Sequence, residues 1–149
     1  MGRLTLPTSG LVYVDANCII YSIEHIAPYD ALLAPCWDTS IPRPFQIVTS
    51  ELAVLEVLVR PLKTHDSVLE ASFRDLLFYS ADVQLFPVTL PILERAARLR
   101  ATTGGLKTPD AIHAATALEV GAAQFLTNDA GFRRVPNLSV TLLDDLLAP

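Results

Sequence analysis

The stretch LVYVDANCIIY, residues 11–21, passes from a short run of β-formers through a polar group into a second apolar run. Leu11–Val14 is apolar and rich in residues that favour strands, so it predicts a buried first strand. Asp15 ends that strand, and Asn17 is a suitable N-cap for a helix that follows it. A strand that leads directly into a helix favours an α/β protein with a parallel sheet.

The rest of the chain repeats this alternation of strands and helices, which predicts a parallel sheet covered on both faces. Pro61 should stop or kink one helix, and Pro87 indicates that the third strand ends early or lies at an edge. Residues 27–44 contain four prolines and should be broken or only partly helical. Further strands are expected at 46–49, 83–88, 124–127 and 138–142, and helices at 50–60, 66–79, 91–103 and from 108 onward.

Composition and length limit the class of protein. With 149 residues, of which 51% are hydrophobic and 18% charged, the chain is not disordered and fits one domain, residues 1–149. This composition leaves more apolar surface than a small monomer usually needs, which favours a dimer or a bound partner. The net charge of −5 argues against nucleic-acid binding, unless several of the acids hold divalent cations.

The cysteines and the hydropathy of the chain bear on its cellular location. Cys18 and Cys36 lack a metal-binding spacing and should be reduced, buried side chains. Neither a signal peptide nor an apolar run of transmembrane length is evident, so we expect a cytoplasmic protein.

Three acidic residues should meet at one edge of the sheet. Asp15 directly follows the first strand, and Asp129 follows the fourth by two residues. Asp110 lies in the first turn of the helix that leads into the fourth strand, and that helix must run antiparallel to the strand. All three acids therefore belong at the carboxyl edge, where open parallel sheets form their sites.

Glu56 is a fourth candidate at the same edge. Leu52, Leu55, Glu56 and Val59 follow the spacing of an inward helical stripe, in which a glutamate is costly unless it is paired or binds a metal. An interior ion pair with Arg60 is the simpler alternative. Four crowded carboxylates repel one another, and Mg²⁺ or Mn²⁺ would relieve that repulsion. One or two such ions also suit the hydrolysis of phosphodiesters.

The same residues resemble the motifs of the PIN domain family, in particular its VapC-type toxin ribonucleases. The first motif resembles LVYVDANCIIY (11–21), with Asp15 as its acid. The other three resemble TSELAVLEVLVRPL (49–62), with Glu56; LKTPDAIHAATALEVGA (106–122), with Asp110; and FLTNDAGFRRV (125–135), with Thr127, Asn128 and Asp129. The resemblance covers nearly the whole chain, and residues 27–44 depart from it by their length and proline content.

The resemblance implies a three-layer α/β/α sandwich around a mainly parallel five-stranded sheet. It also implies Mg²⁺- or Mn²⁺-dependent cleavage of RNA by an endoribonuclease, a homodimer, and inhibition by a small antitoxin in a type II toxin–antitoxin pair. By charge complementarity, a basic side chain of the antitoxin is a candidate to occupy the carboxylate cluster.

The expected site then has three groups of residues. Asp15, Glu56, Asp110 and Asp129 would hold the cations. Asn17, Thr127 and Asn128 would support them from behind, although Thr127 and Asn128 could equally order their loop. Lys107, Arg133 and Arg134 would contact the RNA backbone because they lie near the motif acids. His113, one turn after Asp110, is more often a packed or groove histidine than a ligand.

Two other functions fit the pattern less well. A phosphatase with an Asp15 nucleophile, like the haloacid dehalogenases, needs a second aspartate at position 17, where Asn17 cannot transfer a proton in that way. A PIN-like binding module without turnover usually lacks an acid, and all four are present here. No G-x-G-x-x-G follows the first strand, which disfavours a dinucleotide-binding protein.

Overall fold

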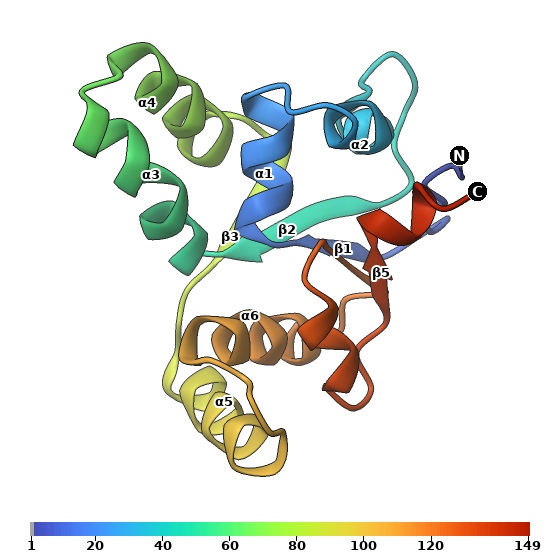
Figure 1. Ribbon diagram of the computed structural model, residues 1–149, viewed down its shortest axis with the longest axis vertical. Helices are drawn as coiled ribbons and strands as arrows, with labels where there is room; N and C mark the ends of the chain where they lie inside the picture. The colour runs from blue at the N-terminus through green and yellow to red at the C-terminus, as the bar shows by residue number, and fades with distance from the viewer. Residues whose placement is uncertain (1) are drawn as a thin grey trace.

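A five-stranded sheet forms the centre of the computed structural model, which describes residues 2–149 (Figure 1). The strand order is β3-β2-β1-β4-β5, and every neighbouring pair is parallel. The first strand therefore lies in the middle, and β3 is an edge strand, as Pro87 indicated. The strands are β1 (Leu11–Val14), β2 (Gln46–Ser50), β3 (Val83–Phe86), β4 (Gln124–Thr127) and β5 (Val140–Leu142).

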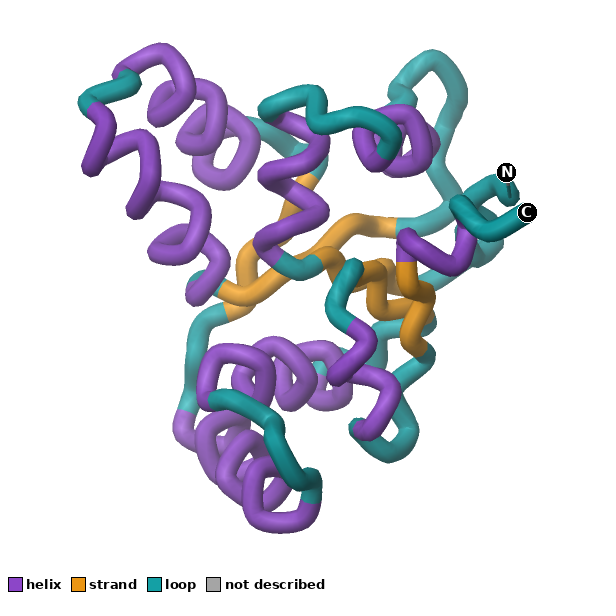
Figure 2. The backbone as a smooth tube through the Cα atoms, viewed as in Figure 1, coloured by secondary structure: helices purple, strands orange, loops and turns teal. Residues whose placement is uncertain are grey.

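Helices cover both faces of the sheet, which confirms the predicted three-layer α/β/α sandwich (Figures 1 and 2). One layer holds α1 (Ala16–Ile23), α2 (Tyr29–Trp37), α3 (Leu52–Thr64) and α4 (Ser67–Arg74), which continues into a π-helical turn, Asp75–Tyr79. The other layer holds α5 (Leu90–Thr102) and α6 (Thr108–Glu119). Two 3-10 turns, Ala130–Arg134 and Leu143–Leu146, follow β4 and β5.

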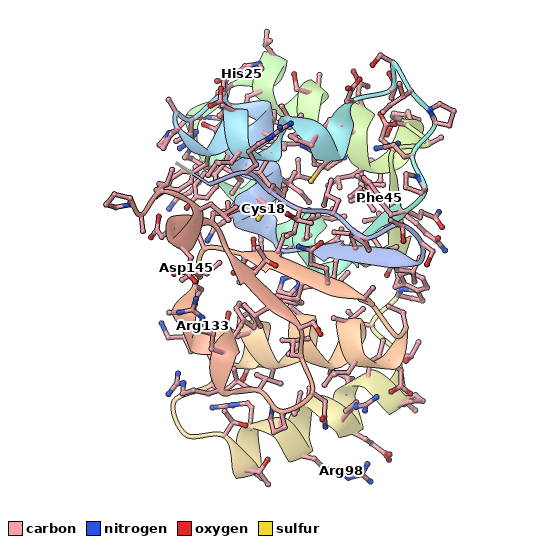
Figure 3. The ribbon with its side chains drawn as sticks, turned by 90° about the vertical axis from the view of Figure 1, so that its right-hand side faces the viewer. Cys18, His25, Phe45, Arg98, Arg133 and Asp145 are labelled. Atoms are coloured by element: carbon pink, nitrogen blue, oxygen red, sulfur yellow. The ribbon has the colours of Figure 1, made fainter. Side chains whose placement is uncertain are left out.

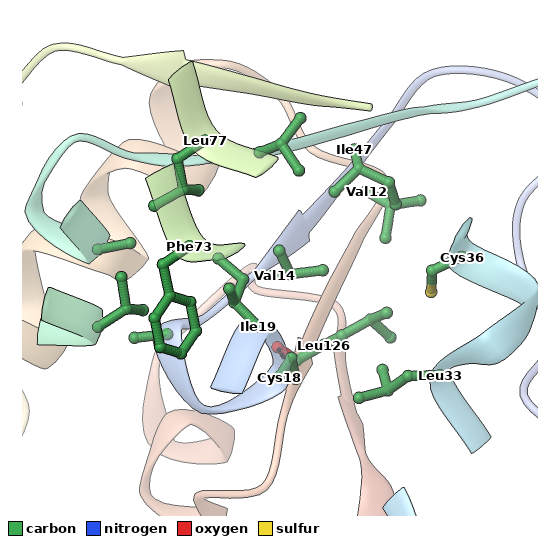
Figure 4. Close-up of a cluster of buried hydrophobic side chains, with 14 of the residues drawn as sticks. Val12, Val14, Cys18, Ile19, Leu33, Cys36, Ile47, Phe73, Leu77 and Leu126 are labelled. Carbon is green, nitrogen blue, oxygen red and sulfur yellow. Dashed lines mark hydrogen bonds between the residues drawn. The ribbon is translucent and has the colours of Figure 1, made fainter. Parts of the chain in front are cut away.

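The alternation of side chains along β1 explains why its sequence is apolar throughout. Val12 and Val14 point into the core beneath α1–α4, which Figure 4 shows, whereas Tyr13 points into the core beneath α5 and α6. All three side chains are completely buried. A strand covered on both faces has no solvent side, so it lacks the polar alternation of a half-exposed strand.

The α3 helix differs from its predicted form in two ways. It continues past Pro61 to Thr64 and ends at His65, whose left-handed backbone places its N–H on the Pro61 carbonyl. The predicted inward stripe is also wrong, because Leu55 is 63% exposed and Val59 is 46% exposed. The buried residues are Ala53, Val57, Leu58 and Pro61. Apolar side chains surround this helix, so the hydrophobic pattern alone did not identify the face that packs.

The first helix and the proline-rich segment differ in how well the sequence predicted them. Asp15, not Asn17, is the N-cap of α1, because its side chain accepts the Cys18 N–H. The segment 27–44 is partly helical, as predicted, with α2 continuing through Pro35. Cys18 and Cys36 are free thiols in the core, and burial raises the pKa of Cys36 to about 12. Within residues 2–149, every helix is too short or too polar to be a transmembrane candidate.

Candidate active site at the carboxyl edge of the sheet

A pocket of about 240 Å³ lies where β1 and β4 end. It brings together all four predicted carboxylates, which come from positions as far apart as 15 and 129. Its lining consists of Asp15, Ala16, Asn17, Ile20, Glu56, Asp110, His113, Asp129 and Phe132. The convergence expected from the parallel topology is therefore present in the structure.

Asp15 is fixed at the bottom of this pocket. It is only 5% exposed; its Oδ1 accepts the Cys18 N–H at 3.1 Å, and its Oδ2 accepts the Thr127 hydroxyl. Burial raises the pKa of Asp15, while the hydrogen bonds from Thr127 and Cys18 oppose that rise. The residue therefore both caps α1 and presents a carboxylate to the pocket.

Asp110, in the first turn of α6, and Asp129, in the turn that follows β4, both line the pocket. Burial raises the pKa of Asp110, and the negative charge of Asp129 adds to that rise. Asp129 is exposed and is held by the turn that follows β4: its Oδ1 accepts the Gly131 N–H at 2.8 Å. The Asp129 N–H donates to the Thr127 hydroxyl at 3.0 Å, so Thr127 connects Asp15 and Asp129.

Glu56 is held by His113, not by Arg60. The Nε2 atom of His113 contacts a carboxylate oxygen of Glu56, whereas Arg60 pairs with Glu24. His113 is 2% exposed, and its Nδ1 lies 2.5 Å from the hydroxyl of Tyr13. His113 is thus a buried member of the site, and its place one turn after Asp110 was the available signal. The sequence did not indicate a role for Tyr13, because a tyrosine is an ordinary residue in a buried strand.

Only two of the three residues expected to support the carboxylates lie beside them in the structure. Asn17 is exposed and lines the pocket, and Thr127 is buried behind Asp15 and Asp129. Asn128 does not line it; its Oδ1 accepts the Asp144 N–H at 2.9 Å and orders the turn after β5. Thr127 thus contacts two carboxylate residues of the pocket, whereas the contact of Asn128 orders a loop.

The three basic side chains expected to contact RNA also differ in their partners. Arg133 pairs with Asp145 beside the C-terminal turn, as Figure 3 shows. Arg134 donates from Nη1 to the carbonyl of Gly104 at 2.6 Å, which joins the turn after β4 to the loop before α6. Within residues 2–149, Lys107 forms no ion pair, and it stands at the N-cap of α6.

The donor set suits a hard divalent cation. Four carboxylates offer only oxygen ligands, which Mg²⁺ and Mn²⁺ prefer. Burial raises the pKa of Asp110 and the negative charge of Asp129 adds to that rise, and a bound cation would oppose both effects. Across residues 2–149, no three His, Cys, Asp or Glu groups are already gathered as a ligand cluster. The residues nevertheless fit such an ion by the chemistry of their oxygen atoms and because they line one pocket. Asp15, Glu56 and Asp129 are at the same time engaged by protein partners.

A second cavity of about 540 Å³ lies between α1, α2 and the π-helical turn. Trp37 and Leu76 are among its lining residues, and Asp82 lies at one side. None of the predicted site residues lines it. This larger cavity is therefore not the predicted carboxylate site.

Comparison with known proteins agrees with this geometry. The sequence profile of the PIN domain family matches residues 12–138, most of the chain. The protein therefore belongs to the PIN domain family. No curated protein matches the chain at a significant level.

Solved structures with the same fold include several toxin–antitoxin proteins. VapBC2 from Rickettsia felis, bound to a DNA fragment from its promoter, has a TM-score of 0.69 at 17% identity, covering 89% of this chain and 98% of that one. A toxin–antitoxin complex from Klebsiella pneumoniae has a TM-score of 0.65 at 25% identity, covering 87% and 95%. VapC20 from Mycobacterium tuberculosis, a toxin that cleaves the sarcin-ricin loop, has a TM-score of 0.66 at 16% identity, covering 82% and 92%.

Proposed function

We propose that this protein is a divalent-cation-dependent endoribonuclease and the toxin of a type II toxin–antitoxin pair. One observation carries the proposal: in a chain of the PIN domain family, Asp15, Glu56, Asp110 and Asp129 line a single pocket at the carboxyl edge of the sheet. The toxin assignment rests on the shared fold with VapC-type proteins, some of which were solved as complexes with their antitoxins.

The proposed reaction is hydrolysis of an RNA phosphodiester. A water oxygen attacks phosphorus, the bond from phosphorus to one ribose oxygen breaks, and that oxygen leaves with a proton. Bound Mg²⁺ or Mn²⁺ would supply charge neutralisation at the phosphate and a lowered pKa for water. Asp15 and Asp110 would hold the ion from the pocket floor and from α6, and Glu56 and Asp129 would complete the oxygen ligands.

The fixed geometry of Asp15 supports this role. Two hydrogen bonds already orient its carboxylate, and each carboxylate oxygen retains a lone pair that can face the pocket. Thr127 extends the same order to the loop of Asp129. Lys107, at the entrance to α6, is the cation best placed to meet the phosphate backbone of the substrate.

A cleavage assay with a matched control tests the proposal. A pool of structured RNA is incubated with the pure protein in Mg²⁺, Mn²⁺ or EDTA. Asp110→Asn removes a pocket carboxylate, and Glu94→Gln removes an exposed carboxylate of α5 outside the pocket. We expect cleavage that requires the metal, is retained by Glu94→Gln, and falls about a hundredfold or more in Asp110→Asn. No cleavage in any condition, with no Mn²⁺ binding by calorimetry, would instead identify a silent binding module.

Homodimerisation is a further part of the proposal. Leu55, Val59 and Leu62 form an exposed apolar stripe along the outer side of α3, at the spacing of one helical face. A second copy of the chain that presents the same stripe would bury it on both sides. Light scattering at micromolar concentration should give a dimer mass, and Leu55→Lys with Val59→Lys should give a monomer. A wild-type monomer would exclude this contact.

An antitoxin is the second proposed partner. The pocket presents several carboxylates, so a basic side chain of a partner would find charge complementarity there. Such a partner would inhibit by occupying the positions of the cation and the phosphate. A complex in which the partner leaves the four carboxylates accessible would contradict this mode of inhibition.

A further inference from the structure

A hydrogen-bonded chain leads from the core to the wall of the pocket and joins three elements of the fold. Tyr13 of β1, His113 of α6 and Glu56 of α3 follow one another in it. Tyr13 is completely buried and stacks on Phe125, with ring centroids 5.0 Å apart and planes 4° apart. Its hydroxyl accepts the Ser50 N–H at 3.1 Å. The first two members of the chain are therefore held rigidly by the core.

Counting donors and acceptors assigns the hydrogen atoms in this chain. An ionised carboxylate can only accept, so the His113 Nε2 atom that faces Glu56 must carry a hydrogen. The Tyr13 oxygen already accepts from Ser50, and burial keeps the pKa of Tyr13 well above its usual range, so its hydroxyl retains its proton. That proton has the His113 Nδ1 atom, 2.5 Å away, as its acceptor. His113 satisfies both of its contacts when Nε2 carries a hydrogen and Nδ1 keeps a lone pair.

Glu56 has one more rotatable bond than the three aspartates of the pocket, so it has more side-chain freedom to lose. It stands on the flank of α3, and its side chain is 29% exposed. A long glutamate side chain loses rotamer freedom when it is fixed, and a hydrogen bond from a rigid donor offsets part of that cost. Asp15 obtains the same restraint from the Cys18 N–H and from Thr127.

We propose that His113 is a positioning residue whose Nε2–H, set by Tyr13, holds one oxygen of Glu56 so that the other is presented to a divalent cation in the pocket. The inference rests on the proposed function, because it concerns the cation that the carboxylates would bind. It assigns roles to two side chains outside the acidic motif positions. A histidine that donates to a ligating carboxylate acts on the ion through the carboxylate, not by contact.

The first test reads the tautomer in the metal-free protein, without any activity. Two-bond ¹⁵N–¹H spectra of histidine-labelled protein distinguish Nε2–H, Nδ1–H and imidazolium forms. His113→Gln assigns the His113 signals, and the exposed His25 and His65 serve as internal controls. We expect the Nε2–H tautomer to predominate over the Nδ1–H tautomer in the wild type, and this preference to be lost in Tyr13→Phe while the two controls stay unchanged. A predominant Nδ1–H tautomer in the wild type would overturn the assignment.

The second test measures Mn²⁺ binding by calorimetry in two variants of similar size. His113→Gln keeps an N–H donor for Glu56, and His113→Leu has none. We expect the leucine variant to bind Mn²⁺ about ten- to a hundredfold more weakly, as for other residues that orient metal ligands, and glutamine to restore most of that loss. Equal weakening of both variants would show a role in packing alone, and unchanged binding by leucine would show no role.

The outcomes for the wild type and for His113→Leu distinguish a wrong positioning role from a wrong proposed function. If the wild type binds Mn²⁺ and cleaves RNA but His113→Leu binds Mn²⁺ equally well, only the positioning role is wrong. If the wild type binds no Mn²⁺, the proposed function and the cation role of Glu56 are both wrong. The tautomer of His113 then still shows whether Tyr13 and Glu56 fix its protons.

Discussion

Substitutions of Asp15 should separate its part in the fold from its part in the site. Asp15→Ala removes the acceptor of the Cys18 N–H, the cap of α1, and the acceptor of the buried Thr127 hydroxyl. Asp15→Asn keeps an oxygen for Cys18, and its amide N–H can donate to the Thr127 oxygen in place of the bond in which Thr127 donates. Both variants remove the buried carboxylate, whose burial raises its pKa, so that contribution cancels between them.

The difference in stability follows from the two contacts. Loss of an N-cap acceptor costs about 1 kcal/mol, and an amide that can still contact the Thr127 hydroxyl retains roughly another 1 kcal/mol. Asp15→Ala should therefore be about 2 kcal/mol less stable than Asp15→Asn. For a chain of this length that difference lowers the melting temperature by about 4–8 °C. Asp15→Asn itself should melt close to the wild type, since it also removes a desolvated charge.

Thermal unfolding in EDTA, followed by circular dichroism, measures this difference, and the RNA cleavage assay accompanies it. Both variants should lose cleavage by about a hundredfold or more, because both lack the Asp15 carboxylate. Equal melting temperatures for the two variants would refute the capping argument. Wild-type cleavage by Asp15→Asn would refute the cation role of Asp15 while leaving its structural role intact.

Two further substitutions test the charge and the backbone of the site. Asp110→Asn should be as stable as the wild type or more stable in EDTA at pH 7. Burial and the charge of Asp129 raise the pKa of Asp110 in the folded protein, so the ionised carboxylate lowers the stability of the wild type. Urea unfolding should show this advantage shrink as the pH falls and vanish below about pH 4, where the carboxyl is protonated in both folded and unfolded chains; an advantage that grows in acid would contradict the sign. Gly105→Ala should lose about 1–2 kcal/mol, because φ is +76° and the new Cβ would lie 2.9 Å from Nη1 of Arg134. Gly104→Ala, with open space around its Cβ, is the control and should unfold as the wild type does.

The protein has few basic side chains with which to bind the phosphates of RNA. With a net charge of −5, and with Arg133 and Arg134 engaged within the chain, few basic side chains remain near the pocket. If the proposed function holds, phosphate binding depends strongly on the divalent cation, and less on a basic surface of the kind that most nucleic-acid-binding proteins use.

The sequence by itself determined the order of the elements and the edge at which the acids meet. Apolar strands such as Leu11–Val14 and the proline of the third strand are local features, and local features set where strands and helices begin and end. The parallel topology then places Asp15, Asp110 and Asp129 together without any knowledge of side-chain contacts. The repeated strand–helix units are therefore sufficient to predict from the sequence where the candidate site lies.

Only the tertiary structure decided which face of α3 is buried and which partner each polar group takes. Leu55 and Val59 look as suitable for the core as Val57, because the choice depends on what packs against the helix. His113 finds Glu56 at a separation of 57 residues and Tyr13 at a separation of 100. No local pattern encodes such pairs, because the free energy of a buried hydrogen bond depends on neighbours that only the folded chain brings together.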